Sequence, residues 1–433
     1  MKIHGWGRYP KIDANLFYPK NQSECINYIK KKSFIPRGSG RSYGDSANAD
    51  NVLHSLCLNQ IIKFDKINGV IICQSGVTFR DLISIIVPEG WFFPVTPGTS
   101  NLTVGGAVAA DVHGKNHHNK GSFSNYVLSI DMILGSGDFV SVSRDSLPDL
   151  FYATCGGMGL TGFIFSATLQ LKRITSSKII QSTKIFKSLE EVCDSFEKFS
   201  SANYSVAWLD TLATGKDFGR SVLFIGNHSD DEDLNINKFK SLNLPIKFGA
   251  FMINKYTMSL FNKIYYKKNS INKENKYLID INNFFYPLDA IKNWNLIYGN
   301  SGFIQYQFVI PKNNSVLNLK KILKKINEHN QFSTLAVLKL LGKSNDNYLS
   351  FPMEGLTLAL DFKLSNSIVK LIKFLDEMIV DMNGKIYLAK DALMSENTFK
   401  KTYSKWKKFQ AVRIKYHAND KFVSSQSKRL GLL

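Results

Sequence analysis

Three glycine-rich segments, separated by predicted strands, constrain this chain more than any other feature. "RGSGRSYGDSA" occupies residues 37–47, "PGTSNLTVGGAVAADVHGKNHH" residues 97–118 and "GGMGLTGF" residues 156–163. Glycine permits positive φ and close approach of the backbone to a ligand. Successive backbone N–H groups in such a loop can form a nest for an anion. Arginines stand on both sides of the first glycine core, which favours a phosphate.

Spacing and order argue against two common nucleotide-binding folds. "RGSGRS" lacks the GxxxxGK[ST] spacing of a P-loop. "GGMGLTG" contains GxGxxG, but a Rossmann fingerprint follows a strand and opens a helix. Here the helix-like "LPDLFYATC" precedes the glycines and the strand-like "FIFSATLQL" follows them. We therefore interpret this segment as a tight helix-to-strand turn.

The hydrophobic pattern predicts an α+β protein. "NQSECINYIKKK" is typical of a helix capped by Asn21 or Ser23, and residues 69–90 predict a strand, a turn and a helix capped by Thr78. "YVLSIDMILGSGDFVSVS" predicts a β-hairpin. Further on, "GFIQYQFVIP" and "GLTLALDFKL" alternate as strands, and residues 315–330 and 366–384 form amphipathic helices, the second ending at Asn383-Gly384. Such alternation favours a sheet covered on one face by helices.

Charge and cysteine content limit the partners. Lys+Arg 55 against Asp+Glu 35 gives a net charge of +20, which suits a nucleic acid, a phosphorylated substrate or an acidic membrane. The scattered lysines fit compositional drift equally well. Five cysteines without a CxxC argue against a disulfide framework or a thiol metal site, and adjacent His117 and His118 are a poor chelate, so we expect no metal. We expect no signal peptide and no membrane span.

In this order, the three glycine segments resemble the FAD-binding domain of the vanillyl-alcohol oxidase type. "GWGR" at residues 5–8, "PLDAIKNWN", "GFIQYQFVIP", "LSFPMEG" and "YLAKD" narrow the resemblance to the decaprenylphosphoryl-β-D-ribose 2′-oxidase family. The similarity runs nearly end to end and is weakest over residues 225–280. It implies a two-part FAD-binding domain at 1–175 and a substrate domain, an antiparallel sheet covered by helices, at 176–384. Residues 385–433 are expected to return to the FAD-binding domain.

The resemblance implies noncovalent FAD. In related sugar and lactone oxidases a histidine of the first loop bonds to the flavin, and Arg41 stands at that position. The pyrophosphate is expected against backbone N–H groups of residues 37–46 and 103–106. The residues that match cofactor positions are Pro36, Arg37, Gly38, Ser39, Gly40, Arg41, Ser42, Tyr43, Gly44, Asp45, Ser46, Gly98, Thr103, Val104, Gly105, Gly106, Ala110, Asp111, Val112, His113, Ile164 and Tyr387.

Catalytic and substrate positions also follow from the resemblance. Lys115 and Lys390 match active-site lysines, and Tyr43 is expected beside the flavin. Two cations there would favour a reduced, anionic flavin and a phosphate substrate. The predicted substrate contacts are Gln305, Gln307, Lys339 and Lys390. Gln305 and Gln307 share one face of an alternating strand, which could also be a solvated face.

The implied reaction oxidises the 2′-hydroxyl of a pentose carried on polyprenyl phosphate to the 2′-keto sugar. A short-chain NAD(P)H reductase would complete a C2′ epimerisation that serves arabinose synthesis for the cell wall. Peripheral contact with the inner face of the membrane is expected, and export with a partner stays open. The alternatives are a soluble alditol or sugar-lactone oxidase, and an RNA-binding protein that uses the basic, aromatic insert 252–276. No nucleic-acid partner is expected.

Overall fold

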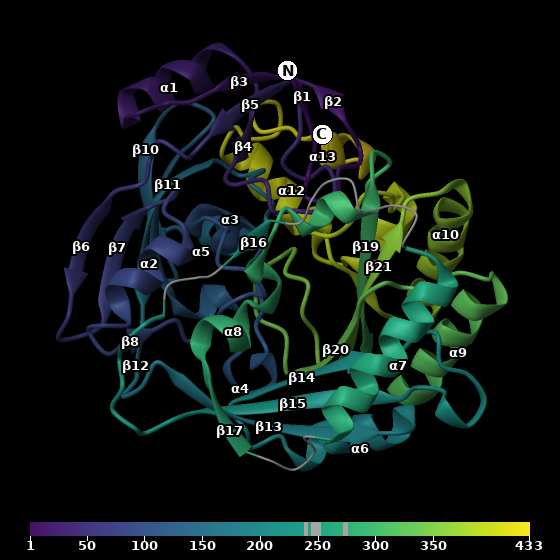
Figure 1. Ribbon diagram of the computed structural model, residues 1–433. Coiled ribbons are helices and arrows are strands. Elements are labelled where there is room, and N and C mark those ends of the chain that lie inside the picture. The colour runs from purple at the N-terminus through teal and green to yellow at the C-terminus, as the bar shows by residue number, and fades with distance from the viewer. Residues whose placement is uncertain (238–240, 244–252, 272–275) are drawn as a thin grey trace.

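The computed structural model describes residues 1–237, 241–243, 253–271 and 276–433. In Figure 1 the N-terminal elements, purple to blue, lie on one side of the molecule, and a teal and green sheet lies on the other. The yellow C-terminal helices lie back against the purple N-terminal strands. Most of the buried apolar side chains belong to one continuous core that spans both parts.

A five-stranded antiparallel sheet forms most of the N-terminal part. Its order is β10 (Phe139–Ser143), β9 (Val127–Ile133), β11 (Phe163–Gln170), β7 (Val70–Gln74) and β6 (Ile61–Asp65). α2 (Phe79–Ile86) begins in a capping box between Thr78 and Asp81 and buries Phe79, Leu82 and Ile83. The short α3 (Val104–Ala109), α4 (His117–Lys120) and α5 (Pro148–Thr154) lie in the connections, and β8 (Trp91–Phe92) pairs with β12 (Lys172–Arg173).

A small parallel sheet positions the first glycine segment. Its order is β3 (Asn15–Phe17), β5 (Asn51–His54) and β4 (Ile35–Arg37), and α1 (Gln22–Lys31) connects β3 to β4. The glycine-rich loop leaves the carboxyl end of β4. β1 (Lys2–Ile3) pairs with β2 (Ile12–Asp13) beside it. The sequence therefore places this loop directly after a buried parallel strand.

An eight-stranded sheet forms the second part. The order is β17 (Lys276–Asp280), β13 (Lys178–Phe186), β15 (Ser221–His228), β14 (Tyr204–Leu209), β20 (Ala336–Leu341), β21 (Gly355–Lys363), β19 (Phe303–Pro311) and β22 (Lys385–Ile386), with every pairing antiparallel. β16 (Leu242–Asn243) pairs separately with β18 (Ile291–Lys292). This sheet contributes one wall of the site described below.

Helices cover one face of the eight-stranded sheet. α6 (Leu189–Lys198), α9 (Ser315–Glu328) and α10 (Asn366–Asp381) pack side by side on it. On β19, Tyr306 donates a hydrogen bond to Asp376 of α10, 2.9 Å, so its strand neighbours Gln305 and Gln307 point to the opposite face. α7 (Lys255–Ile271) and α8 (Ile281–Phe285) contact the β13 end of the sheet (Figure 1).

The C-terminal segment packs against the N-terminal part. It contains α11 (Glu396–Thr402), α12 (Trp406–Lys415) and α13 (Ser425–Arg429). The fully buried Arg413 donates to the carbonyl oxygen of Leu160, 3.0 Å, and the backbone N–H of Phe34 donates to Lys421 O, 2.8 Å. Residues far apart in the sequence thus enclose one core.

The predicted α+β fold is confirmed, and so are several elements. α1 is capped by Asn21, the hairpin is β9–β10, and the third glycine segment is the turn between α5 and β11. After α10, Asn383 takes a φ of 54°. Within the described ranges, no helix has the length and apolar character needed to span a membrane.

Candidate active site

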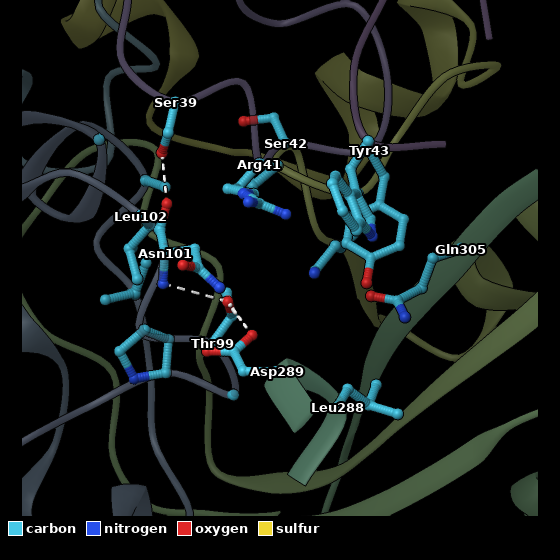
Figure 2. A pocket seen from close by; sticks show the side chains of 18 of the residues that line it. Ser39, Arg41, Ser42, Tyr43, Thr99, Asn101, Leu102, Leu288, Asp289 and Gln305 are labelled. Atoms are coloured by element: carbon cyan, nitrogen blue, oxygen red, sulfur yellow. Dashed lines mark hydrogen bonds between the residues drawn. The ribbon is translucent and has the colours of Figure 1, made fainter. Parts of the chain in front are cut away.

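A cavity of about 780 Å³ lies where the glycine segments meet the uncovered face of the eight-stranded sheet. One wall comes from residues 36–43 and 97–106, and the other from β14, β19, β20 and β21. Figure 2 shows Tyr43 of the first wall facing Gln305 of the second. The turn after β22 brings Tyr387 and Lys390 to the same space. This volume is in the range of small-molecule and cofactor sites.

The first glycine segment presents unpaired backbone donors to this cavity. Its base is fixed by Arg37, which donates to Ala47 O at 3.0 Å, Asn48 Oδ1 at 2.6 Å and His4 O at 2.8 Å. Gly40 has a φ of 65°, and a Cβ there would lie 2.4 Å from the Arg37 guanidinium. The N–H groups of residues 39–42 donate to no residue that the structure describes, and these residues line the cavity. They form a ready nest for a phosphate.

The second segment contributes fewer donors than the sequence predicted. Thr103 caps α3, and the N–H groups of Val104 and Gly105 donate to Val77 O and Ser75 O, both at 2.9 Å. The N–H of Gly106 donates to the Thr103 hydroxyl, 3.3 Å. The expectation that the N–H groups of 104–106 hold a pyrophosphate is therefore corrected. Those of Val104 and Gly105 fasten α3 to the turn between β7 and α2, and that of Gly106 is used in the cap of α3.

The guanidinium of Arg41 lies over an aromatic ring at the cavity wall. Its guanidinium carbon is 4.1 Å from the centroid of Trp6, and its Nε has no hydrogen-bond partner among the described residues. Burial lowers the pKa of Arg41, and the charge of Asp289 opposes this effect. Asp289 itself accepts hydrogen bonds from Thr99 Oγ1 and Ser100 N, each 2.7 Å (Figure 2). A positive group is thus held beside the phosphate nest.

Three lysines line the cavity on or near the sheet. Burial lowers the pKa of Lys115 to about 7, of Lys339 to about 8 and of Lys390 to about 7. Lys115 donates to Phe284 O and lies 4.4 Å from the centroid of that ring. No hydrogen bond joins the ammonium of Lys339 or Lys390 to a described residue. A bound anion would favour the charged form of all three.

Lys390 belongs to a small polar cluster. Its Nζ lies 3.8 Å from the centroid of the Tyr43 ring. The Tyr43 hydroxyl points toward the Gln305 side chain (Figure 2). Gln305 Nε2 donates to Asp361 Oδ1, 2.6 Å. Asp361 is fully buried and its Oδ2 has no partner within the described residues. Burial raises the pKa of Asp361 to about 7, and the charge of Lys390 opposes this shift.

His113, Gln307 and Tyr387 form the neighbouring part of the wall. His113 Nε2 and Gln307 Nε2 are 3.0 Å apart, so the ring nitrogen accepts and the amide donates. The Tyr387 hydroxyl donates to Ala110 O, 3.0 Å, and the rings of His113 and Tyr387 are 5.3 Å apart. Burial and the nearby lysines lower the pKa of His113 far below its usual value, so this imidazole is neutral.

Most of the predicted site residues line this one cavity. They are Pro36, Arg37, Gly38, Ser39, Gly40, Arg41, Ser42, Tyr43, Ser46, Gly98, Thr103, Gly105, Gly106, Ala110, Val112, His113, Lys115, Ile164, Gln305, Gln307, Lys339, Tyr387 and Lys390. The structure brings together positions spread over more than three hundred residues of sequence. Their individual roles stay predictions.

Four predicted cofactor residues lie behind the wall instead. Gly44 packs against the backbone of Asp391, and Asp45 forms an ion pair with Arg429, 2.7 Å. Val104 is fully buried in the core. Asp111 accepts hydrogen bonds from three polar side chains: Asn345 Nδ2 at 2.7 Å, Asn347 Nδ2 at 2.9 Å and Ser350 Oγ at 2.5 Å. These residues support the wall from outside the cavity.

Residues of the site that the sequence did not indicate include Trp6, Trp208, Asp289 and Asp361. Trp6 and Asp289 stand in quoted motifs, but no local pattern indicated what they contact. Asp361 carried a usable signal, because a carboxyl in the apolar strand "GLTLALDFKL" needs a buried partner. Among the described residues, no group of three or more His, Cys, Asp or Glu could hold a metal ion.

Comparison with known proteins identifies the fold and the family. The FAD binding domain family model matches residues 15–143. Decaprenylphosphoryl-beta-D-ribose oxidase of Mycolicibacterium smegmatis is 32% identical over 454 residues, covering 100% of this chain and 98% of that protein. This chain belongs to the decaprenylphosphoryl-β-D-ribose oxidase family.

Two further relatives are more distant. An uncharacterised protein of Streptomyces coelicolor is 25% identical over 377 residues, 82% of this chain and all of that protein. D-lactate dehydrogenase of Archaeoglobus fulgidus is 30% identical over 166 residues, 35% of this chain and 37% of that protein. The family member is accordingly an FAD-dependent oxidoreductase.

The cavity fits FAD in its donors as well as its size. Residues 39–42 supply unpaired N–H groups for a pyrophosphate. Arg41 Nε, Ser75 Oγ and His113 Nδ1 are buried atoms of cavity-lining residues, and none has a partner within the part of the chain described. A Cβ added at Gly98 would meet nothing within 4 Å, so the backbone of this lining residue has open space beside it. Buried polar groups without partners are costly, so a polar ligand here satisfies them.

Proposed function

We propose that this flavoenzyme oxidises the 2′-hydroxyl of a pentose carried on a polyprenyl phosphate to the corresponding 2′-keto sugar. The observation that carries the proposal is the joint presence, in one cavity, of a phosphate nest and three buried lysines. Full-length similarity to an oxidase of decaprenylphosphoryl-ribose supports the same substrate class.

The cavity offers two anion sites, one built from backbone N–H groups and the other from lysines. The N–H nest at 39–42 with Arg41 suits the pyrophosphate of the cofactor, and Lys115 and Lys339 suit the phosphate of the substrate. Each ammonium is desolvated, so its attraction to a phosphate is stronger than in water. These lysines have no ion-pair partner in the described chain.

The Lys390 cluster suits the reacting hydroxyl. When bound, FAD supplies the acceptor for the hydride that leaves C2′. Lys390 Nζ, with a pKa of about 7, can accept the hydroxyl proton in its neutral form or stabilise the developing oxyanion in its charged form. Tyr43 confines this amine from one side and Gln305 connects the cluster to Asp361. Gln307 and His113 lie beside them, with polar atoms for the other hydroxyls of the sugar.

A soluble alditol or sugar-lactone oxidase is not favoured. Free polyols need no phosphate site, yet the cavity wall carries three lysines. The cavity also extends along an apolar path lined by Val206, Trp208, Phe224 and Tyr265, which suits the first isoprene units of a lipid better than a polyol.

Further parts of the proposal concern the cellular setting and the division of the chain. We assign FAD-binding to residues 1–175 and 385–433, and substrate binding to 176–384; the packing of α11–α13 on the N-terminal part supports this division.

A keto sugar requires a reductase to complete a C2′ epimerisation, so we propose a short-chain NAD(P)H reductase as partner in arabinose synthesis for the cell wall. Peripheral contact with the inner face of the membrane, without nucleic acid, completes the proposal.

Anaerobic titration tests the proposed function directly. Polyprenyl-phosphate ribose with a short, water-soluble prenyl chain is expected to bleach the FAD absorbance within seconds to minutes. Ribose 5-phosphate, xylitol and a sugar lactone serve as comparison substrates. Faster reduction by xylitol or the lactone than by the prenyl-phosphate sugar would contradict the proposal.

A further inference from the structure

α7 exposes large apolar side chains on its outer side, whereas a helix packed on a globular core usually exposes polar ones. Its outer side carries Tyr256, Leu260, Phe261, Ile264 and Ile271, which are 86%, 61%, 53%, 59% and 75% exposed. We name these five residues the outer stripe. Tyr256, Leu260, Ile264 and Ile271 follow one another at intervals of four, four and seven residues, which places these four on one helix face. Exposed apolar groups of this size gathered on one element indicate a contact surface.

The inner side of α7 is polar and aromatic. Asn262 is buried and donates to Asp210 Oδ1, 2.6 Å. The Tyr266 ring lies 5.2 Å from the guanidinium of Arg220. Because this side is held by specific contacts to Asp210, which follows β14, and Arg220, which precedes β15, the helix has a fixed orientation. The outer stripe therefore faces away from the sheet.

The charges beside the stripe have one sign. Lys263, Lys267 and Lys268 are exposed and form no ion pair with a described residue, and α7 contains no Asp or Glu. The basic, aromatic insert 252–276 includes this helix, while Met252 and residues 272–275 lie outside the described residues. Lysines alternating with bulky apolar groups on one exposed face are characteristic of helices that lie in an anionic lipid interface.

The helix also borders the cavity. Tyr265, on the inner side, packs its ring 4.8 Å from that of Trp208, and both side chains line the cavity. Ile264 is next to Tyr265 in α7, and Leu260 precedes Tyr265 by five residues. α7 thus lies between this apolar part of the cavity, which Tyr265 lines, and the outer stripe.

We infer that the outer stripe of α7 is the surface by which the protein docks on an anionic lipid bilayer. This inference rests on the proposed function, since docking there places the apolar end of the cavity next to the layer that holds a polyprenyl lipid. The apolar side chains enter the boundary of the acyl chains and the three lysines contact the headgroups. A substrate then passes from bilayer to cavity with its prenyl chain remaining in apolar surroundings.

Vesicle co-sedimentation of the FAD-loaded protein tests the docking surface. The probes are vesicles of equimolar phosphatidylglycerol and phosphatidylcholine, and vesicles of phosphatidylcholine alone. The double variant L260E/I264E is expected to bind the anionic vesicles ten- to a hundredfold more weakly than the wild type. The variant K263Q/K267Q/K268Q is expected to lose about a hundredfold on anionic vesicles, since each lysine near such a surface contributes on the order of 1 kcal/mol, and little on neutral ones.

A matched control places the same charges elsewhere. I62E/I67E changes two isoleucines of 55% and 88% exposure on the N-terminal part and should retain wild-type binding. FAD content and the circular dichroism spectrum, expected to be unchanged in every variant, show that the fold is intact. Reduction of FAD by a water-soluble, short-chain prenyl-phosphate ribose should also be unchanged, because neither Leu260 nor Ile264 lines the cavity.

The outcomes separate the two proposals. If L260E/I264E binds vesicles as the wild type does, the docking surface is overturned. If this variant also converts a wild-type dimer to a monomer, the outer stripe is a dimer interface instead. Failure of the wild type to be reduced by the short-chain substrate overturns the proposed function instead, whatever the vesicle result.

Discussion

The ammonium of Lys390 lies 3.8 Å from the centroid of the Tyr43 ring, and this contact joins the two ends of the chain at the cavity. Tyr43 follows β4 in the glycine-rich loop, while Lys390 follows β22 on the edge of the eight-stranded sheet. A hydrogen bond from Tyr43 N to Ala389 O, 2.9 Å, fixes the two segments together. The amine is therefore held by contacts from both parts of the molecule.

Lys390→Ala is expected to retain FAD and to slow its reduction by substrate by a factor on the order of 10²–10⁴. The N–H groups of residues 39–42 do not depend on this side chain, so cofactor occupancy should stay near normal. Stopped-flow absorbance under anaerobic conditions measures the rate. Lys370→Ala, which removes an exposed lysine of α10, is the control. Reduction of the Lys390 variant at the wild-type rate would mean that Lys390 takes no part in the reaction.

Asp361→Asn is expected to shift the pH profile of FAD reduction to lower pH. Burial lowers the pKa of Lys390 and the charge of Asp361 raises it, and with both effects present the pKa is about 7. Without that charge the ammonium of Lys390 loses its proton at a lower pH. A step that needs the neutral amine then becomes fast at lower pH, and a step that needs the ammonium is lost at lower pH. Both cases move the midpoint in the same direction.

The single-turnover rate from about pH 5.5 to 9, spanning the pKa values near neutrality, locates this midpoint. Asp376→Asn is the comparison, because this carboxyl is also buried, with a pKa raised to about 8 by burial, but it bonds to Tyr306 on the helix-covered face. An unchanged midpoint in Asp361→Asn would remove Asp361 as the residue that positions and tunes Lys390.

Local elements were predictable because their determinants lie within a few residues. Thr78 and Asp81 form a capping box that can be read from the sequence, and the alternation in "GFIQYQFVIP" correctly placed Gln305 and Gln307 on one face. The turn at "GGMGLTG" also followed from the order of its neighbours. Each of these depends on short-range geometry that propensity and periodicity describe.

Long-range contacts were not predictable in the same way. The expectation of free N–H groups at 103–106 failed for Val104 and Gly105, because Val77 and Ser75, about 30 residues away, accept their hydrogen bonds. Asp45 looked like part of the phosphate loop but pairs with Arg429, which follows it by 384 residues. The resemblance supplied the positions of the cavity residues, and the tertiary fold decided which of them face the cavity.

Acid precipitation of the purified yellow protein is expected to release FAD into the supernatant. Covalent attachment at this loop position requires a nucleophilic imidazole, and Arg41 instead stacks on Trp6 as a guanidinium. The measurement is the flavin absorbance of supernatant and pellet after trichloroacetic acid. Yellow colour that stays with the pellet would mean a covalent link through another residue.

Arg429→Met is expected to reduce the free energy of unfolding by about 3 kcal/mol and to weaken FAD binding. Arg429 donates to Asp45 Oδ1 at 2.7 Å and to Asp391 Oδ2 at 2.9 Å, and both carboxylates are nearly inaccessible to solvent. Removing the guanidinium leaves two buried charges unpaired. Asp45 belongs to the glycine-rich loop and Asp391 follows Lys390, so the loss of this bridge loosens both sides of the cavity.

Urea unfolding of the FAD-loaded and FAD-stripped protein measures this effect. Lys428→Ala is a matched control, since the neighbouring Lys428 pairs with Asp50 at 3.6 Å and both side chains are more than half exposed. Exposed pairs contribute about 0–1 kcal/mol, so its unfolding midpoint should hardly move. If Arg429→Met unfolds at the wild-type urea concentration and retains its FAD affinity, the bridge between Asp45 and Asp391 does not hold the cavity walls together. A lower midpoint in both forms, with the larger drop in the loaded form, is the expected result, because a loosened loop loses the binding energy of the cofactor as well as the ion pairs.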